Sequence, residues 1–144
     1  GQGHCQKQGQ DGEQSQRCYQ EQEQSQWCGQ AREAGWVASL VASLLGRPVV
    51  VRAGAEGAYF ARPAASANAA DVTYIPTPRV AAIDTNGAGD AHSGVLAAAL
   101  AQAIPLERAL LLANCAGALS TTLVGPAVCP AREQIEAAAD ALAD

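Results

Sequence analysis

The sequence predicts a domain of the α/β class over residues 31–144. A first helix-like segment is followed by short runs of β-branched and aromatic residues, and long Ala- and Leu-rich segments come after them. This order of helix, strands and helices is typical of helices packed on a sheet. A length of 144 residues suffices for one hydrophobic core and is too short for two full domains.

Residues 1–30 differ in composition from the rest of the chain. Gln stands at many even positions, beginning with Gln2, Gln6 and Gln8, and aliphatic residues are almost absent. Such a segment cannot bury enough apolar surface to offset the conformational entropy lost on ordering. We therefore expect a disordered or artefactual low-complexity leader before the folded part.

Local patterns predict the first helix and four strands. Four apolar residues recur at helical spacing: Val37, Leu40, Val41 and Leu44. They predict the buried face of an amphipathic helix that ends at Gly46. Strands are expected at residues 48–52, 58–61, 72–75 and 80–83, with a loop over residues 62–71.

Three further helices are expected in the second half. The first begins near residues 87–90, runs to about Gln102, and is apolar nearly all round, which predicts burial on every side. The second follows Pro105 and continues to about Thr122, and the third follows Pro130.

Composition excludes several classes of protein. A net charge of −5 without a basic stripe argues against a nucleic-acid partner. The sequence contains no run of 18 apolar residues, so no membrane span is expected. We expect a cytoplasmic protein. Five cysteines at irregular spacing make a poor disulfide framework, and Cys115 is expected as a buried, reduced thiol. A zinc site of His4, Cys5, Cys18 and Cys28 is disfavoured because no C-x-x-C pair is present.

Residues 84–90, D-T-N-G-A-G-D, lie between the fourth expected strand and a helix. Glycines at a strand-to-helix turn expose backbone N–H groups, and the helix dipole adds partial positive charge there, so the turn can bind an anion. An Asp beside a bound phosphate is useful if its carboxylate accepts a proton from a hydroxyl that attacks phosphorus.

Other interpretations of residues 84–90 depend on the residues around them. A dinucleotide-binding G-x-G-x-x-G is disfavoured because His92 takes the place of the third Gly. A P-loop is excluded because the sequence G-K-[ST] is missing and the one lysine, Lys7, lies in the leader. An ordinary helix N-terminus with an acidic first turn remains an alternative.

Residues 84–94, D-T-N-G-A-G-D-A-H-S-G, resemble the D-T-x-G-A-G-D signature of the ribokinase/PfkB carbohydrate kinases. Residues 49–57 are similar to the family's strand and G-x-x-G nucleotide loop, and residues 113–118 and 124–126 to its late helix and following turn. The resemblance covers roughly residues 31–144. It implies a ribokinase-like three-layer α/β fold, truncated to its C-terminal nucleotide-binding half.

The resemblance also implies site residues. Asp90 corresponds to the catalytic base, and Gly87, Ala88 and Gly89 to the anion hole for the transferring phosphoryl group. Nucleotide-binding positions are Gly54, Ala55, Glu56, Gly57, Gly89, Asp90 and Asn114, the last beside the adenine. Positions of a monovalent-cation site are Asp84, Asn86, Ser120, Leu123, Gly125 and Cys129.

The implied activity is transfer of the γ-phosphate of ATP to a hydroxyl of a small sugar or sugar-like molecule, with Mg²⁺ and K⁺ as cofactors. A homodimer of the complete protein is left open. Two alternatives remain: a catalytically silent fragment with at most weak nucleotide binding, and a hydroxymethylpyrimidine or pyridoxal kinase of the same superfamily. DNA upstream of codon 31, read in all frames, would distinguish an intact kinase from a fragment.

The chain departs from the family pattern in several places. Arg52 replaces a common Thr before the loop, which puts one nucleotide contact in doubt. Leu123 stands at an often polar position, Val95 replaces a small residue, and His92 is expected on the helix surface or a pocket wall. The N-terminal half, with its sugar-recognition glycines, is not recognisable. Because a parallel sheet needs its neighbouring strands, we expect exposed strand edges.

Overall fold

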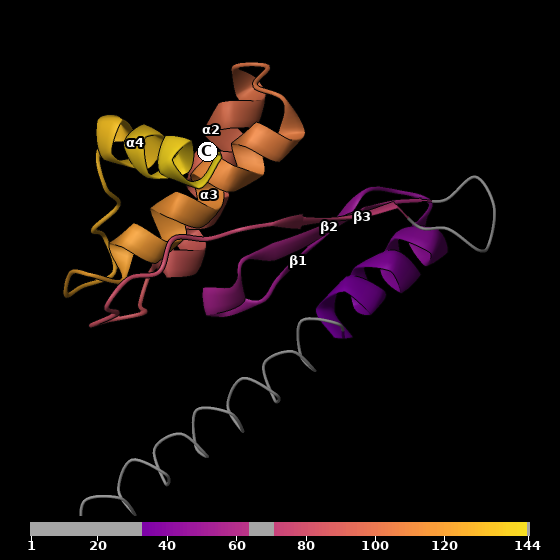
Figure 1. The fold of residues 1–144 in the computed structure, drawn as a ribbon, viewed down its shortest axis with the longest axis horizontal. Coiled ribbons are helices and arrows are strands. Elements are labelled where there is room, and N and C mark those ends of the chain that lie inside the picture. The colour runs from indigo at the N-terminus through magenta and orange to yellow at the C-terminus, as the bar shows by residue number, and fades with distance from the viewer. Residues whose placement is uncertain (1–32, 64–70, 144) are drawn as a thin grey trace, which may run out of the picture. The chain divides into compact units, whose positions relative to one another are not determined.

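The computed structural model describes residues 33–63 and 71–143 (Figure 1). The expected leader and the weighed zinc site of His4, Cys5, Cys18 and Cys28 lie outside these residues. The described elements are a helix over residues 33–45, β1 (Val49–Arg52), β2 (Ala58–Arg62), β3 (Asp71–Ile75), α2 (Ala88–Ala101), α3 (Leu106–Ser120) and α4 (Arg132–Ala143). One 3₁₀ turn, Gly54–Glu56, joins β1 to β2.

The three strands form an antiparallel sheet in the order β1-β2-β3. Phe60 in the central strand pairs with Val50 on one side and with Thr73 on the other. The connections are too short for the crossover that parallel neighbours need, which is why these strands run antiparallel. The strands expected at residues 48–52, 58–61 and 72–75 are thus confirmed, with Arg62 and Asp71 added from the expected loop.

Alternating residues of the sheet serve two hydrophobic clusters. Ala58 and Phe60 pack with Ile75 and with Leu110 of α3 on one face. Ala61 and Tyr59 pack on the other face with the helix of residues 33–45. Because successive strand residues point to opposite faces, one short strand can hold both clusters. The described part of the chain is therefore a three-layer sandwich of helix, sheet and helices (Figure 1).

Helices α2 and α4 pack against α3, whose central turns are buried. Gly117 of α3 lets the two helices approach, because a Cβ there would lie 3.1 Å from the carbonyl oxygen of Ala88 in α2. On its other side α3 packs through Leu112 and Cys115 against Ile135 of α4. Cys115 is a buried free thiol, as expected, and burial raises its pKa to about 11.

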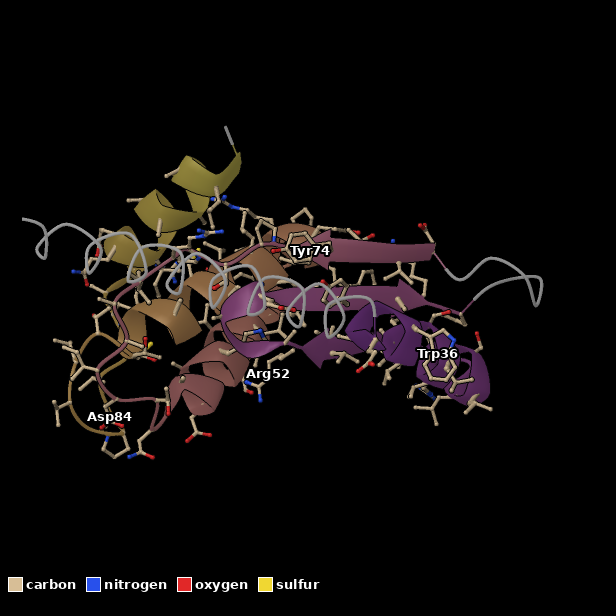
Figure 2. All side chains as sticks on the ribbon, turned by 60° about the horizontal axis from the view of Figure 1, so that its bottom comes forward. Trp36, Arg52, Tyr74 and Asp84 are labelled. Atoms are coloured by element: carbon tan, nitrogen blue, oxygen red, sulfur yellow. The ribbon has the colours of Figure 1, made fainter. Side chains whose placement is uncertain are left out.

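The prediction of which face of the first helix is buried is wrong. Ala38 and Ala42 are fully buried, whereas Val37, Leu40 and Leu44 are exposed. The small Ala side chains allow the helix backbone to lie close to the sheet, and Gly35 shares this side, 3.3 Å from the Tyr59 ring when a Cβ is added. The bulkier residues consequently face outward, with Trp36 (Figure 2).

Two other expectations are also corrected. Residues 80–83 form no strand: the amides of Ile83 and Asp84 both donate to the carbonyl oxygen of Thr121, at 2.7 and 3.1 Å, instead of to a neighbouring strand. In α2 only His92 and Ala99 are buried. Among the described elements α2 packs chiefly on α3, so its opposite face is open to solvent.

Candidate functional site

The turn before α2 is built around Gly87, the N-terminal cap of the helix. Its φ of 77° lies in the left-handed region, and a Cβ at this position would lie 2.1 Å from the carbonyl oxygen of Pro126. Only Gly satisfies both conditions. The turn therefore depends on a loop that lies far along the chain.

The first turn of α2 carries unused hydrogen-bond donors. No side chain caps this helix, and among the described residues the amides of Gly87, Gly89 and Asp90 have no acceptor. Asp90 lies in the same turn and is exposed. The arrangement offers backbone N–H groups and the positive end of a helix dipole next to an accessible carboxylate.

The carboxylate of Asp84 ties this turn to the loop after α3. Its Oδ1 accepts a hydrogen bond from the Asn86 amide at 3.0 Å, and its Oδ2 accepts one from the Gly125 amide at 2.9 Å (Figure 2). These two backbone donors hold the pKa of Asp84 below its ordinary value. Asp84 thus fixes the geometry of the segment that leads into α2.

The Arg52 side chain extends from the end of β1 to the first turn of α2 (Figure 2). Its Nη1 donates a hydrogen bond to the carbonyl oxygen of Gly89 at 3.3 Å. Residues 49–57 and 84–90, the two segments expected to bind the nucleotide, are therefore in contact. The Gly54–Glu56 turn follows Arg52 directly.

Gly57 closes that turn against β3. Its φ is 104°, and a Cβ would lie 2.3 Å from the carbonyl oxygen of Ile75. The turn is held by its own backbone hydrogen bonds, from Ala53 to Gly57 and from Gly57 to Gly54, and by the Tyr74 hydroxyl, which donates to the Glu56 carbonyl at 2.7 Å. The loop is therefore rigidly connected to the sheet.

Asn114 of α3 and His92 of α2 are buried. The Asn114 side-chain amide donates to the carbonyl oxygens of Ile75 and Pro76, at 3.0 and 2.9 Å, and so joins α3 to the end of β3. His92 is buried, not on the helix surface, and its Nε2 has no partner among the described residues. Desolvation and then the charge of Arg52 lower the pKa of His92, against the effect of the Asn114 side chain.

The expected cation positions are brought together only in part. Asp84, Asn86 and Gly125 share hydrogen bonds. The Ser120 hydroxyl donates instead to the Gly117 carbonyl, and Leu123 and Cys129 are exposed without a contact to Asp84 in the described ranges. Residues 33–63 and 71–143 also contain no group of three or more His, Cys, Asp or Glu able to hold a metal ion.

Three contributors to the site were not foreseen from the sequence. The carbonyls of Pro126 and Thr121 shape the turn, and the Arg52 side chain reaches it from the sheet. A carbonyl contact carries no sequence signal, because every residue has a carbonyl group. Arg52 had one visible signal, since a long cation replaces the common small Thr.

Comparison with known proteins shows the family of the chain. The model of the family described as pfkB family carbohydrate kinase matches residues 18–133. The chain belongs to this family. The PfkB match begins within the range that we assigned to the leader, outside the described residues, and it includes the turn of residues 84–90.

Individual PfkB relatives are similar over the same region. The chain is 36% identical over 89 residues to the uncharacterized sugar kinase YegV of Escherichia coli, covering 61% of this chain and 26% of that protein. The ribokinase of Thermotoga maritima is 34% identical with a TM-score of 0.54, over 63% of this chain and 29% of that one. The aminoimidazole riboside kinase of Salmonella enterica, solved with its riboside and an ATP analog, is 31% identical with a TM-score of 0.53, over 62% and 30%.

The chain therefore spans between a quarter and a third of the length of these PfkB proteins. Its fold is a mixed α/β portion of a ribokinase-like fold. No helix in the described ranges has the length and apolar character needed to cross a bilayer.

Proposed function

We propose that this chain carries the nucleotide-binding and phosphoryl-transfer part of an ATP-dependent sugar kinase, the C-terminal half of the family fold. The observation that supports it most is the first turn of α2, where uncapped amides adjoin the exposed Asp90. Each half of this arrangement has a chemical task in phosphoryl transfer: the amides can donate to phosphoryl oxygens, and the carboxylate can accept a proton.

The anion hole is assigned to the amides of Gly87, Ala88 and Gly89. The left-handed φ of Gly87 turns the chain into the helix, and the absence of a side chain at Gly89 leaves its backbone approachable. The Ala88 amide is the least available of the three, since it donates weakly to the Thr85 carbonyl at 3.3 Å. Preorganised N–H groups of this kind stabilise charge that accumulates on a phosphoryl group in the transition state.

Asp90 is assigned the role of general base. Its carboxylate accepts the proton of the acceptor hydroxyl as the oxygen attacks the γ-phosphorus, and the bond from phosphorus to the β-phosphate oxygen breaks on the opposite side. The exposure of Asp90 is compatible with an acceptor that arrives from solvent. The charge on ADP and on the new phosphate ester balances that of ATP once the proton has left.

The nucleotide and the cofactors have suitable residues. The rigid Gly54–Gly57 loop and Asn114 would lie along the nucleotide, although the amide of Asn114 already serves two carbonyls. Mg²⁺ bound with the nucleotide would neutralise phosphate charge. For K⁺, the available donors near Asp84 are carboxylate and carbonyl oxygens, the hard ligands that such ions prefer, and Asp84 would keep the turn and the 120–125 loop together.

The experiment that tests this proposal is Asp90→Asn in the protein completed with the N-terminal part that its relatives carry. With saturating sugar and ATP, kcat should fall about 10²–10⁴-fold, the usual contribution of a positioned base. Nucleotide affinity should stay equal or rise because a negative charge near the phosphates is removed. Glu133→Gln, which removes an exposed carboxylate from α4, is the matched control and should change neither quantity.

Near-wild-type turnover of Asp90→Asn would show that Asp90 only stabilises the helix terminus. Gly89→Leu tests the anion hole separately, because its side chain would block the amides and displace Arg52. It should damage binding and turnover together.

A second candidate is a chain that binds nucleotide without turnover. The observation in its favour is coverage, because the chain spans only 26 to 30% of the relatives' lengths. ATP binding by the protein completed with the N-terminal part, with no phosphate transfer to any sugar, would favour this candidate.

A further inference from the structure

The Arg52 side chain brings a positive charge to the proposed anion hole. It extends from the last residue of β1 to the first turn of α2, and Nη1 donates to the Gly89 carbonyl at 3.3 Å (Figure 2). Its Nη1 and Nη2 lie 3.3 and 3.4 Å from the position of a Cβ on Gly89. The flat guanidinium thus lies against the bare backbone of that glycine.

The charge of this guanidinium is not neutralised. Arg62, Arg108 and Arg132 each have a carboxylate partner, whereas in residues 33–63 and 71–143 no carboxylate lies within salt-bridge distance of Arg52. A guanidinium has five N–H donors, and one of them is used. A cation at the positive end of a helix dipole is electrostatically unfavourable. An anion bound between the Arg52 guanidinium and the N-terminus of α2 would interact favourably with both.

The surroundings of His92 indicate a polar ligand independently. His92 is only 6% exposed, and its Nε2 lacks a partner among the described residues. A buried nitrogen without a hydrogen bond is costly, and it is common at sites that a ligand or water completes. Because burial and the charge of Arg52 lower the pKa of His92, the imidazole is neutral at neutral pH and does not supply the positive charge. Arg52 is therefore the cation of this cluster.

We propose that Arg52 binds the phosphate chain of the nucleotide, donating its free N–H groups to phosphate oxygens at the N-terminus of α2. This inference rests on the proposed function and adds to it a side-chain contact to the amides of residues 87–89. Planar, bidentate donation is the form in which Arg recognises phosphate, and Lys cannot reproduce it. Gly89 has a second task in this scheme, because any side chain there would press on the guanidinium.

The experiment measures binding of ATP and of adenosine to the full chain by calorimetric titration. Arg52→Gln should weaken ATP binding about 10- to 100-fold, the usual effect of losing a charge-assisted hydrogen bond, and should leave adenosine binding unchanged. Arg52→Lys should recover only part of the ATP affinity. Arg132→Gln, which removes an equal charge from the exposed start of α4, is the control and should bind both ligands as the wild type does.

The outcomes separate the two proposals. If the wild type binds ATP and Arg52→Gln binds it equally well, the assignment of Arg52 is wrong and the proposed function stands. An equal loss for ATP and adenosine would also overturn it, because Arg52 would then act on the fold and not on phosphate. If the wild type binds neither ligand, the proposed function fails and the assignment of Arg52 fails with it.

Discussion

His92 illustrates how one residue couples the site to the stability of the fold. Its ring is buried between α2 and α3, and the pKa is lowered by desolvation and by Arg52. The folded protein therefore binds a proton at His92 less readily than the unfolded chain, whose His titrates near 6.5. By linkage, the stabilisation from neutral His92 is complete above the unfolded pKa and is lost as the pH falls through the lower, folded one.

Urea unfolding at about pH 8 and about pH 5.5 tests this coupling. The unfolding midpoint of the wild type should drop on acidification, and that of His92→Gln should drop less because the substituted side chain does not titrate. Carboxylates and His4 contribute equally to both proteins, so the difference between the two drops isolates His92. Equal drops would contradict the assignment of a lowered pKa.

At the scale of elements, α2 depends on which of its glycines has a conformational task. Gly87 has a positive φ and lies against the Pro126 carbonyl, whereas Gly94 has ordinary helical geometry with nothing within 4 Å of an added Cβ. Substitution of Gly by Ala should therefore change the stability of the folded protein in opposite directions at these two positions, which lie seven residues apart.

Gly87→Ala should destabilise the protein by more than about 1 kcal/mol, because the new Cβ meets both a disfavoured φ and a backbone atom. Gly94→Ala should stabilise it by about 0.5–1 kcal/mol, the usual gain from replacing Gly inside a helix. Chemical denaturation of the three proteins gives both differences directly. A stabilised Gly87→Ala variant would mean that the turn differs from the one described.

Sequence patterns predicted the elements better than their environments. Helical spacing and β-branched runs located the helices and three strands, because these signals are local. The buried face of the first helix was predicted wrongly because Ala occurs both in cores and on surfaces. The burial of Ala38 and Ala42 follows only from the close approach of the helix to the sheet. The contacts Gly87 to Pro126 and Arg52 to Gly89 join segments distant in sequence, so no local pattern could predict them.

At the scale of the whole molecule, the described residues include several large apolar side chains that are exposed. Large exposed side chains include Trp36, Leu44 and Leu45 on the first helix, Tyr74 on β3, and Val124 after α3. Adjacent groups of this kind favour association with other apolar surfaces. The net charge of −5 opposes self-association only in part, since it is screened at physiological ionic strength.

We expect the purified chain to self-associate as its concentration rises, and Leu44→Glu to reduce this tendency. Because Leu44 is 75% exposed, the substitution should change the free energy of unfolding by less than about 0.5 kcal/mol. Ala42→Glu, two residues away but fully buried, should instead unfold the protein because it buries a charge. Sedimentation velocity and thermal unfolding measure the two effects, and a wild type that stays monomeric at all concentrations would contradict the prediction.

The bond between Asp84 and the Gly125 amide, 41 residues apart, has a consequence for synthesis on the ribosome. Residues 84–90 emerge from the ribosome before Gly125 and Pro126, the partners that fix their turn. The nascent chain can form the three strands early, because each pairs with its neighbour in sequence. The turn that precedes α2 acquires its final geometry only when Gly125 and Pro126 have emerged.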